Sequence, residues 1–332
     1  MARNTNLHAA KRAKQDEFYT QLADIEKEMN GYLDYNPDVF KDKVILLPCD
    51  DPEWSNFTKF FASRFQDYGI KKIISTSYSG VGGRGKISIF DGVGGGEWSY
   101  LDGDGDFRSD EVTELRDEAD IVVTNPPFSL YRDFVKWLVE GDVLFSIIGN
   151  KNSVAYKDIF PLIKGNKMWV GYRSMSGDML FDLPADRKAE LQASEKPGSK
   201  YRIVDGEVFG SVAALWLTNI KHGRRNEQLE LLSMADNLKY SRRKKIREEG
   251  YPEYDNYDAI EVGFTEAIPS DYKGVMGVPI SFLDKYNPEQ FEILGCSYAY
   301  GRPEGWSEDV KMSPSVNGRN IFKRVLIRHK RR

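Results

Sequence analysis

The chain has 332 residues, of which 40% are hydrophobic and 13% are aromatic. This length predicts one catalytic domain with a smaller partner, and the composition supplies enough apolar surface for a sizeable core. With two cysteines and three histidines at no metal-ligand spacing, the sequence argues against a disulfide framework, a bound metal and a histidine-based triad. No apolar run reaches the roughly 18 residues that span a bilayer. The polar, basic N-terminus is not a secretory signal, so we expect a cytoplasmic protein.

The net charge of -4 conceals an uneven distribution of charge along the chain. Residues 102–120 carry nine acids and two bases, whereas residues 239–247 carry six bases and no acid. Segregation of this kind suits a cationic ligand at one place and phosphate groups at another. The plainer alternative is that each charged run is a solvated surface.

Helical and strand patterns alternate through the first half of the chain. Short, continuously apolar runs such as residues 44–47 predict strands that are buried on both faces. The expected elements are a helix over 20–33, a strand over 44–47, a helix over 55–68, a strand over 70–77, a strand or hairpin over 87–90 and 98–101, a strand over 121–123, a helix over 130–139 and a strand over 143–148. This alternation predicts an α/β fold with a mainly parallel, doubly wound sheet. Ligands bind such sheets at the carboxyl ends of strands, where Asp50, Asp51 and Asn125 stand.

The second half of the chain is less regular. Strands are expected over 167–171 and 208–217. Residues 184–205 are predicted to form an exposed loop or insertion, because Lys-Pro-Gly-Ser-Lys at 196–200 is typical of turns. After residue 222 the sequence becomes charged, rich in tyrosine and rich in turns. We therefore expect two domains, residues 1–221 and residues 222–332.

The strongest local signal is Ile-Val-Val-Thr-Asn-Pro-Pro-Phe at residues 121–128. An apolar strand runs directly into Asn125, and a helix follows the aromatic Phe128. The alternative is a plain turn after a strand, where asparagine and proline are common. The Asn-Pro-Pro-Phe sequence resembles the catalytic signature of amino-methyltransferases, which use S-adenosylmethionine on a Rossmann-like sheet.

The resemblance implies that Asn125, Pro126, Pro127 and Phe128 are catalytic. The exocyclic nitrogen of adenine is a poor nucleophile, because its lone pair is delocalised into the ring. The Asn125 side-chain oxygen and the Pro126 carbonyl oxygen are suited to accept hydrogen bonds from its two N–H groups. The consecutive prolines stiffen the loop, so that both acceptors are aimed before the base arrives. Phe128 is suited to stack on a flipped base.

Other segments carry the same resemblance. Asp-Glu-Phe-Tyr-Thr at 16–20 is similar to an N-terminal cofactor segment, and Gly-Asp-Phe at 105–107 is similar to the acid–aromatic pair that holds the cofactor adenine. Cys-Asp-Asp-Pro at 49–52 replaces the usual glycine-rich turn. The implied cofactor contacts are Phe18, Tyr19, Thr20, Asp50, Asp51, Asp106 and Phe107. The alternative role is an Asx turn for the acids at 50 and 51, and core packing for the aromatics at 18 and 19.

Together with residues 274–286 and 322–328, these segments make the chain resemble the EcoRI-type adenine-specific methyltransferases over nearly its whole length. The resemblance implies a site-specific DNA adenine-N6 methyltransferase, in restriction-modification or as a solitary enzyme, with S-adenosylmethionine as cofactor. Its expected partner is double-stranded DNA, held by a C-terminal target-recognition region. The predicted DNA-binding residues of that region are Arg242, Arg243, Lys244 and Lys245. A cognate restriction endonuclease would act on the same site without a stable complex, and with no dimerisation signature we expect a monomer.

Two other functions share the motif. Asn-Pro-Pro-aromatic loops also serve enzymes that methylate RNA bases or a glutamine side chain of a protein. A catalytically silent protein on the same fold would bind DNA without methyl transfer. The segregated basic residues favour DNA over protein as the substrate and leave RNA open.

Overall fold

The computed structural model describes residues 19–80, 82–93, 97–194, 196–198, 200–297, 301–303 and 314–330. Phe18, one of the predicted cofactor residues, lies outside them. The chain forms two compact units: unit 1 is made of residues 1–153 and 170–222, and unit 2 of residues 154–169 and 223–332. The division falls after residue 222, and the segment 154–169, expected in the N-terminal domain, groups with unit 2.

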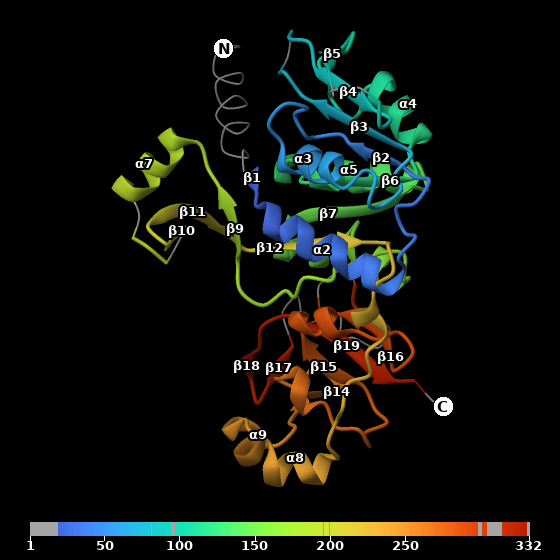
Figure 1. Ribbon diagram of the computed structural model, residues 1–332. Helices are drawn as coiled ribbons and strands as arrows, with labels where there is room; N and C mark the ends of the chain where they lie inside the picture. Colours follow the sequence, from blue (N-terminus) through green and yellow to red (C-terminus); the bar gives the residue numbers. More distant parts are fainter. Residues whose placement is uncertain are drawn as a thin grey trace, which may run out of the picture. The chain divides into compact units, whose positions relative to one another are not determined.

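Unit 1 is built on an eight-stranded sheet. Its strands are β2 (Val44–Leu47), β3 (Lys72–Ser77), β4 (Lys86–Phe90), β5 (Trp98–Tyr100), β6 (Ile121–Thr124), β7 (Leu144–Asn150), β8 (Trp169–Val170) and β12 (Ala214–Thr218). They lie in the order β5-β4-β3-β2-β6-β7-β12-β8 (Figure 1). The four strands β3, β2, β6 and β7 are parallel to one another, whereas β4, β5 and β12 pair antiparallel with their neighbours. The prediction of a mainly parallel sheet therefore holds only for its centre.

The antiparallel edge has a simple cause in the lengths of the connections. Residues 78–85 join β3 to β4, and residues 91–97 join β4 to β5. A parallel crossover needs a dozen or more residues, so connections of this length return the chain antiparallel. The two short runs at 87–90 and 98–101 thus form a hairpin.

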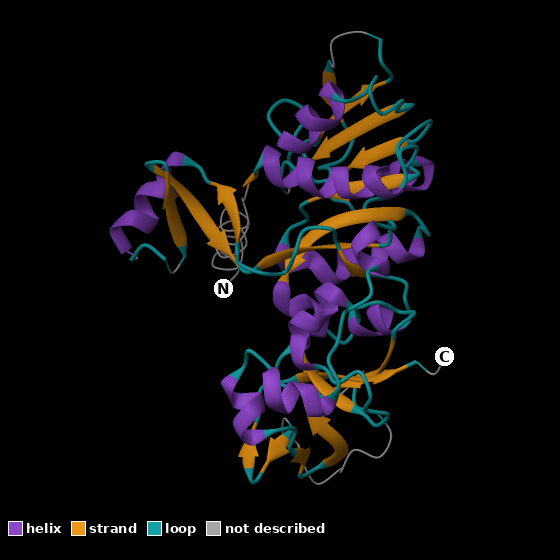
Figure 2. Ribbon diagram, turned by 60° about the horizontal axis from the view of Figure 1, so that its bottom comes forward, coloured by secondary structure: helices purple, strands orange, loops and turns teal. Residues whose placement is uncertain are grey.

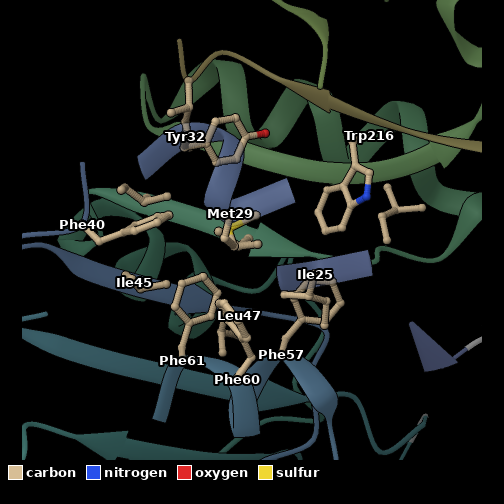
Figure 3. Close-up of a cluster of buried hydrophobic side chains, with 14 of the residues drawn as sticks. Ile25, Met29, Tyr32, Phe40, Ile45, Leu47, Phe57, Phe60, Phe61 and Trp216 are labelled. Atoms are coloured by element: carbon tan, nitrogen blue, oxygen red, sulfur yellow. The ribbon is translucent and has the colours of Figure 1, made fainter. Parts of the chain in front are cut away.

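Helices cover the sheet, and the expected helices are present with shifted ends. These are α2 (Leu22–Tyr35), α3 (Asn56–Ser63) and α5 (Tyr131–Glu140), whereas a further helix, α4 (Asp110–Glu118), was not predicted. Figure 3 shows side chains of α2 and α3 meeting Ile45 and Leu47 of β2 and Trp216 of β12 in one buried cluster. Leu46 lies between those two β2 residues and so points to the opposite face. On the α4 side, Trp137 of α5 donates its indole N–H to Thr113 of α4 at 3.0 Å, which packs these two helices together.

A smaller four-stranded antiparallel sheet also belongs to unit 1. It consists of β1 (Tyr19–Thr20), β9 (Met179–Asp182), β11 (Glu207–Val212) and β10 (Tyr201–Val204), in that order. Of the two predictions for 184–205, the loop is wrong, because this stretch contains α7 (Ala185–Ser194) and β10, which forms a hairpin with β11; the alternative, an insertion, stays a prediction. The turn residues at 196–200 only connect the two elements.

The predicted long strand over 208–217 is also wrong. It is two strands, β11 and β12, which pair in different sheets. The chain changes sheets at Ala213, whose carbonyl accepts the N–H of Lys151 at 2.7 Å. A continuous apolar run therefore did not correspond to one continuous ladder.

Unit 2 has its own five-stranded sheet, in the order β13-β14-β15-β19-β16. Figure 2 shows the helices of the chain in purple and its strands in orange. Its strands are β13 (Glu253–Tyr254), β14 (Tyr257–Glu261), β15 (Met276–Pro279), β16 (Phe291–Cys296) and β19 (Arg324–His329), with a separate pair β17 (Ser315–Val316) and β18 (Arg319–Asn320). Its helices are α6 (Phe160–Lys164), α8 (Met234–Tyr240) and α9 (Lys244–Glu249). The 3-10 turns of the chain are η1 (Phe128–Leu130), η2 (Lys151–Ala155), η3 (Gly223–Asn226), η4 (Thr265–Ala267) and η5 (Ile280–Lys285). Within the described ranges, no helix combines the length and apolar character needed to cross a membrane.

Candidate active site

The Asn-Pro-Pro-Phe loop leaves the carboxyl end of β6, a fully buried strand between β2 and β7. Asn125 is half-buried and Pro126 is buried, so both acceptor-bearing residues lie at the end of a rigid strand. The 3-10 turn η1 follows at once, and the N–H of Leu130 donates to the carbonyl of Pro127 at 3.0 Å. Phe128 packs partly against the buried cluster of α2 and α3. Regular structure therefore fixes the loop at both of its ends.

Asp50 connects the end of β2 to the base of this loop. Its carboxylate accepts hydrogen bonds from the hydroxyls of Thr124, at 2.6 Å, and Ser55, at 2.7 Å. Thr124 is the last residue of β6 and directly precedes Asn125. Ser55 caps α3 by accepting the N–H of Phe57 at 3.1 Å. One buried carboxylate thus ties together a strand end, a helix start and the acceptor loop.

The position of Asp50 changes its acidity. Burial raises the pKa of its carboxyl, and the hydrogen bonds from Thr124 and Ser55 lower it. Burial has the larger effect, so the pKa is about 7. An ordinary aspartate has a pKa near 4. The folded chain therefore binds more protons at this group than the unfolded chain between about pH 4 and pH 7.

Stability should respond to pH accordingly. Between about pH 4 and pH 7 only the folded state keeps a proton on the Asp50 carboxyl. We therefore expect the contribution of Asp50 to the free energy of unfolding to fall as pH rises through this range and to be constant above it. Asp50→Asn, which removes the titration, should flatten this part of the curve in urea unfolding at a series of pH values. If wild-type and variant curves stay parallel from pH 4 to pH 7, the carboxyl does not titrate in the way that its burial requires.

Asp51 lies beside Asp50 in a different environment. Its carboxylate accepts the N–H of Glu53 at 2.9 Å, which is the Asx turn expected before a proline-containing loop. Lys86 of β4 lies 3.2 Å from the same carboxylate and also pairs with Glu53. Asp51 is buried, so this turn and this ion pair hold the loop after β2 in place.

The N-terminal segment lies against the same loop. Tyr19 and Thr20 form β1, which pairs with β9, and the side chain of Asn56 donates to the carbonyl of Thr20 at 2.8 Å. The ring of Tyr19 contacts the ring of Trp54 edge-on, with centroids 4.8 Å apart. The hydroxyl of Thr20 is buried and has no hydrogen-bond partner among the described residues. A buried polar atom without a partner is rare in folded proteins and indicates a place for a ligand atom or a water.

Asp106 and Phe107 lie on the loop that follows the hairpin. Arg108 donates to the Asp106 carboxylate through two nitrogens, at 2.9 and 2.6 Å, and these bonds hold the pKa of Asp106 below its usual value. Phe107 is buried, with its ring edge-on to Phe134 at 4.9 Å. Gly105 brings this loop against β3, because a Cβ there would lie 2.3 Å from the carbonyl oxygen of Ser77. Its φ of +83° also favours glycine.

Three residues near the loop were missed by sequence reasoning. Thr124 and Ser55 donate hydrogen bonds to Asp50. Tyr78 is half-exposed and directly follows β3. Burial raises the pKa of Tyr78 most, and the negative charges of Asp104 and Asp106 raise it further. The signal for Thr124 was present, since it is the one hydroxyl in an otherwise apolar strand. Nothing local to Ser55 indicates its partner. Among the described side chains, no three acids, histidines or cysteines gather as a metal site.

The predicted DNA-binding residues lie in unit 2, around the start of α9. Arg243 lies over the ring of Phe264 at 4.6 Å and pairs with Glu266 at 2.6 Å. Lys244 pairs with Glu248 and Lys245 with Glu249, each one helical turn apart. Arg242 is exposed. All four residues are therefore at the surface, with three of their charges matched locally by glutamates.

The chain is similar to known methyltransferases over its whole length. The family model described as "Adenine-specific methyltransferase EcoRI" matches residues 6–92 and 86–330. The Type II methyltransferase M.EcoRI of Escherichia coli is 41% identical, over 100% of this chain and 99% of the relative. Type II methyltransferase M.MpnI of Mycoplasma pneumoniae is 39% identical over 86% of this chain and 84% of its own length, and M.MgeORF184P of Mycoplasma genitalium is 35% identical over 97% and 98%. No solved structure matches.

A central strand that ends in an Asn-Pro-Pro-Phe loop, together with these relatives, defines a methyltransferase. The chain belongs to the EcoRI family of adenine-specific methyltransferases.

Proposed function

We propose that this chain is a site-specific DNA methyltransferase that transfers a methyl group from S-adenosylmethionine to the N6 nitrogen of a flipped adenine in duplex DNA. The membership of the family and the names of the type II relatives support the reaction. The observation that carries the proposal is the acceptor loop at residues 125–128, which is anchored through Thr124 to the buried Asp50.

The loop residues act on the amine of the target base. The Asn125 side-chain oxygen and the Pro126 carbonyl oxygen accept its two N–H groups, which localises the lone pair on nitrogen without deprotonating it first. Phe128 stacks on the base and repays part of the few kcal/mol that flipping costs. Because the loop is already rigid, the acceptors need no reorganisation when the base arrives. Transfer is direct, with no covalent enzyme intermediate.

The cofactor supplies an electrophilic methyl group on a positively charged sulfur. The residues that would hold it are Phe18, Tyr19, Thr20, Asp50, Asp51, Asp106 and Phe107. The buried, unsatisfied hydroxyl of Thr20 fits a ligand atom, and the acids nearby suit a cationic ligand. Asp50 and Asp51 each bind protein groups through both carboxylate oxygens, so the Thr20 hydroxyl, which has no partner among the described residues, is the better candidate for direct contact.

The finer organisation belongs to the same proposal. The first part of the chain, residues 1–221 without the segment 154–169, is a Rossmann-like catalytic domain, in which the helix-covered parallel centre of the sheet carries the ligands at its carboxyl ends. Residues 222–332 form the target-recognition region, with Arg242, Arg243, Lys244 and Lys245 on DNA phosphates. The enzyme is a cytoplasmic monomer of a restriction-modification system, and a cognate endonuclease acts on the same site without a stable complex.

The test is to incubate the protein with S-adenosylmethionine labelled on its methyl group and with genomic DNA, and then to analyse the nucleosides. The proposal requires the label in N6-methyladenine. Label in cytosine would contradict the acceptor chemistry. Label only in added RNA or in protein would identify one of the two rival methyltransferases, and DNA binding without any label would identify a silent binding protein.

Thr124 provides a second test, of the anchor rather than of the acceptor. Thr124→Val removes the hydroxyl that Asp50 binds while it keeps the β-branched shape of the side chain. We expect kcat to fall by about tenfold to a hundredfold with little change in KM for DNA, because small misplacements of a reacting group cost up to about this much. Thr124→Ser restores the hydroxyl and should recover most of kcat. A fall in both variants alike would show that the hydrogen bond is not what positions the loop.

A further inference from the structure

Arg225 is an arginine of unit 2 whose charge is not matched by any acid among the described residues. Its guanidinium carbon lies 4.0 Å from the centre of the Trp169 ring and 5.8 Å from that of Tyr286. One nitrogen donates to the side-chain oxygen of Asn166 at 2.7 Å. No carboxylate of the described residues pairs with Arg225. Its guanidinium has five N–H groups, and among the described residues only Asn166 accepts a hydrogen bond from them.

The neighbouring arginines of unit 2 make the contrast clear. Arg224 pairs with Asp284 at 3.3 Å, Arg324 with Glu261 at 2.6 Å and Arg328 with Glu292 at 2.8 Å. Burial lowers the pKa of Arg225 to about 10, with Tyr286 opposing the change. A half-buried cation without a counterion raises the free energy of the protein, and an anion at this place would lower it.

The geometry selects the kind of anion. The Trp169 ring and the bond to Asn166 restrict the movement of the guanidinium, whose other N–H groups make no hydrogen bond to a described atom. A fork of parallel donors matches two oxygens of a phosphate group. Lys164 and Lys167, which flank Asn166 in the sequence, are both exposed and add positive charge nearby.

We propose that Arg225, held by Trp169 and Asn166, binds a phosphate group of the DNA backbone. This inference rests on the proposed function for its source of phosphate. It adds to unit 2 a DNA contact that includes the segment 154–169, which lies far from residue 225 in the chain and was assigned by sequence to the catalytic domain. Residues 242–245 carry more charge, but glutamates compensate most of it.

The experiment measures binding of a random-sequence DNA duplex to the full chain by fluorescence anisotropy over a range of salt concentrations, without methyl donor. Each phosphate contact contributes about 0.9 to the slope of log K against log salt. Arg225→Gln should therefore weaken binding and reduce that slope by about 0.9, whereas Arg225→Lys, which keeps the charge, should keep the slope. Arg328→Ala is the matched control: it removes the same charge from the same unit, but from a paired arginine, and should leave the slope unchanged.

Three results would overturn the assignment. The slope of Arg225→Gln could equal that of Arg328→Ala, which would show no phosphate contact. Arg225→Gln could weaken binding only to DNA that carries the methylated site, which would show a contact to a base edge. Inorganic phosphate at constant ionic strength could stabilise wild type but not Arg225→Gln against thermal unfolding while both proteins bind the duplex equally well, which would show a site for free phosphate and not for DNA. Thermal unfolding of each variant checks the fold, and because no methyl donor is present, failure of methyl transfer by wild type is a separate result.

Discussion

Asn125→Ala should lower kcat for methyl transfer by about 100- to 1000-fold, which is the loss typical of removing one hydrogen bond that forms at the reacting centre. The variant keeps the Pro126 carbonyl, the stiff loop and the Thr124 anchor, so only one of the two acceptors for the amine is lost. Binding of DNA and of S-adenosylmethionine should change by only a few-fold. Steady-state kinetics with labelled methyl donor, together with separate binding measurements, give these quantities.

Asn150 offers a matched control for this substitution. It also ends a strand of the same sheet, β7, and its side-chain oxygen accepts the N–H of Asn152 at 2.9 Å in a local turn. Asn150→Ala should therefore leave kcat within a few-fold of wild type. Equal losses in the two variants would attribute the effect to disturbed strand ends and not to an acceptor for adenine.

Glu28→Ala should lower the free energy of unfolding by about 3–9 kcal/mol, because three donors, one buried and two partly buried, lose their acceptor at about 1–3 kcal/mol each. Glu28 is fully buried on α2. It accepts the hydroxyl of Tyr32 at 2.6 Å and the backbone N–H groups of Tyr172 and Arg173, each at 2.7 Å. Tyr32 in turn contacts the hydroxyl of Ser146 on β7 at 2.8 Å, so the carboxylate ties α2 to the sheet and to the segment after β8.

The control lies on the same helix. Glu26, whose side chain is 45% exposed, pairs with Arg64 at 3.0 Å. Surface ion pairs of this kind contribute roughly 0–1 kcal/mol to stability. Urea unfolding of Glu28→Ala and Glu26→Ala should therefore differ by several kcal/mol. If the two losses agree within about 1 kcal/mol, the buried network contributes no more than an exposed ion pair.

These two sites differ in how far the sequence predicts them. The strand, loop and helix around Asn125 were predicted correctly, because a continuous apolar run, two prolines and a helical pattern are each local properties of the chain. The first helix was also predicted, but its buried face does not follow from residue polarity, since Leu22 is 49% exposed and Glu28 is fully buried. The Glu28 carboxylate accepts hydrogen bonds from backbone N–H groups 144 and 145 residues away, and no pattern within the helix indicates these donors.

Tertiary pairing also explains the other differences. The bond between Asp50 and Thr124 joins residues 74 positions apart, so Asp50 was predicted as a cofactor contact and not as an anchor of the loop. The basic run at 242–245 was conspicuous in the sequence, but its compensation by Glu266, Glu248 and Glu249 depends on folding. Arg225 was overlooked because its unusual environment arises from segment 154–169, which joins unit 2 only in the folded chain.

The most direct test of the account separates activation of the amine from flipping of the base. Single-turnover methyl transfer is measured for wild type and Asn125→Ala on two unmethylated duplexes that contain the sequence in which the enzyme methylates adenine. In one duplex the target adenine lies opposite thymine, and in the other it lies opposite an abasic position. If Asn125 accepts a hydrogen bond from the amine, the variant is slower by the same factor, about 100- to 1000-fold, on both duplexes. If the defect disappears when the adenine is unpaired, Asn125 serves base flipping, and the claim that it activates the nitrogen is wrong.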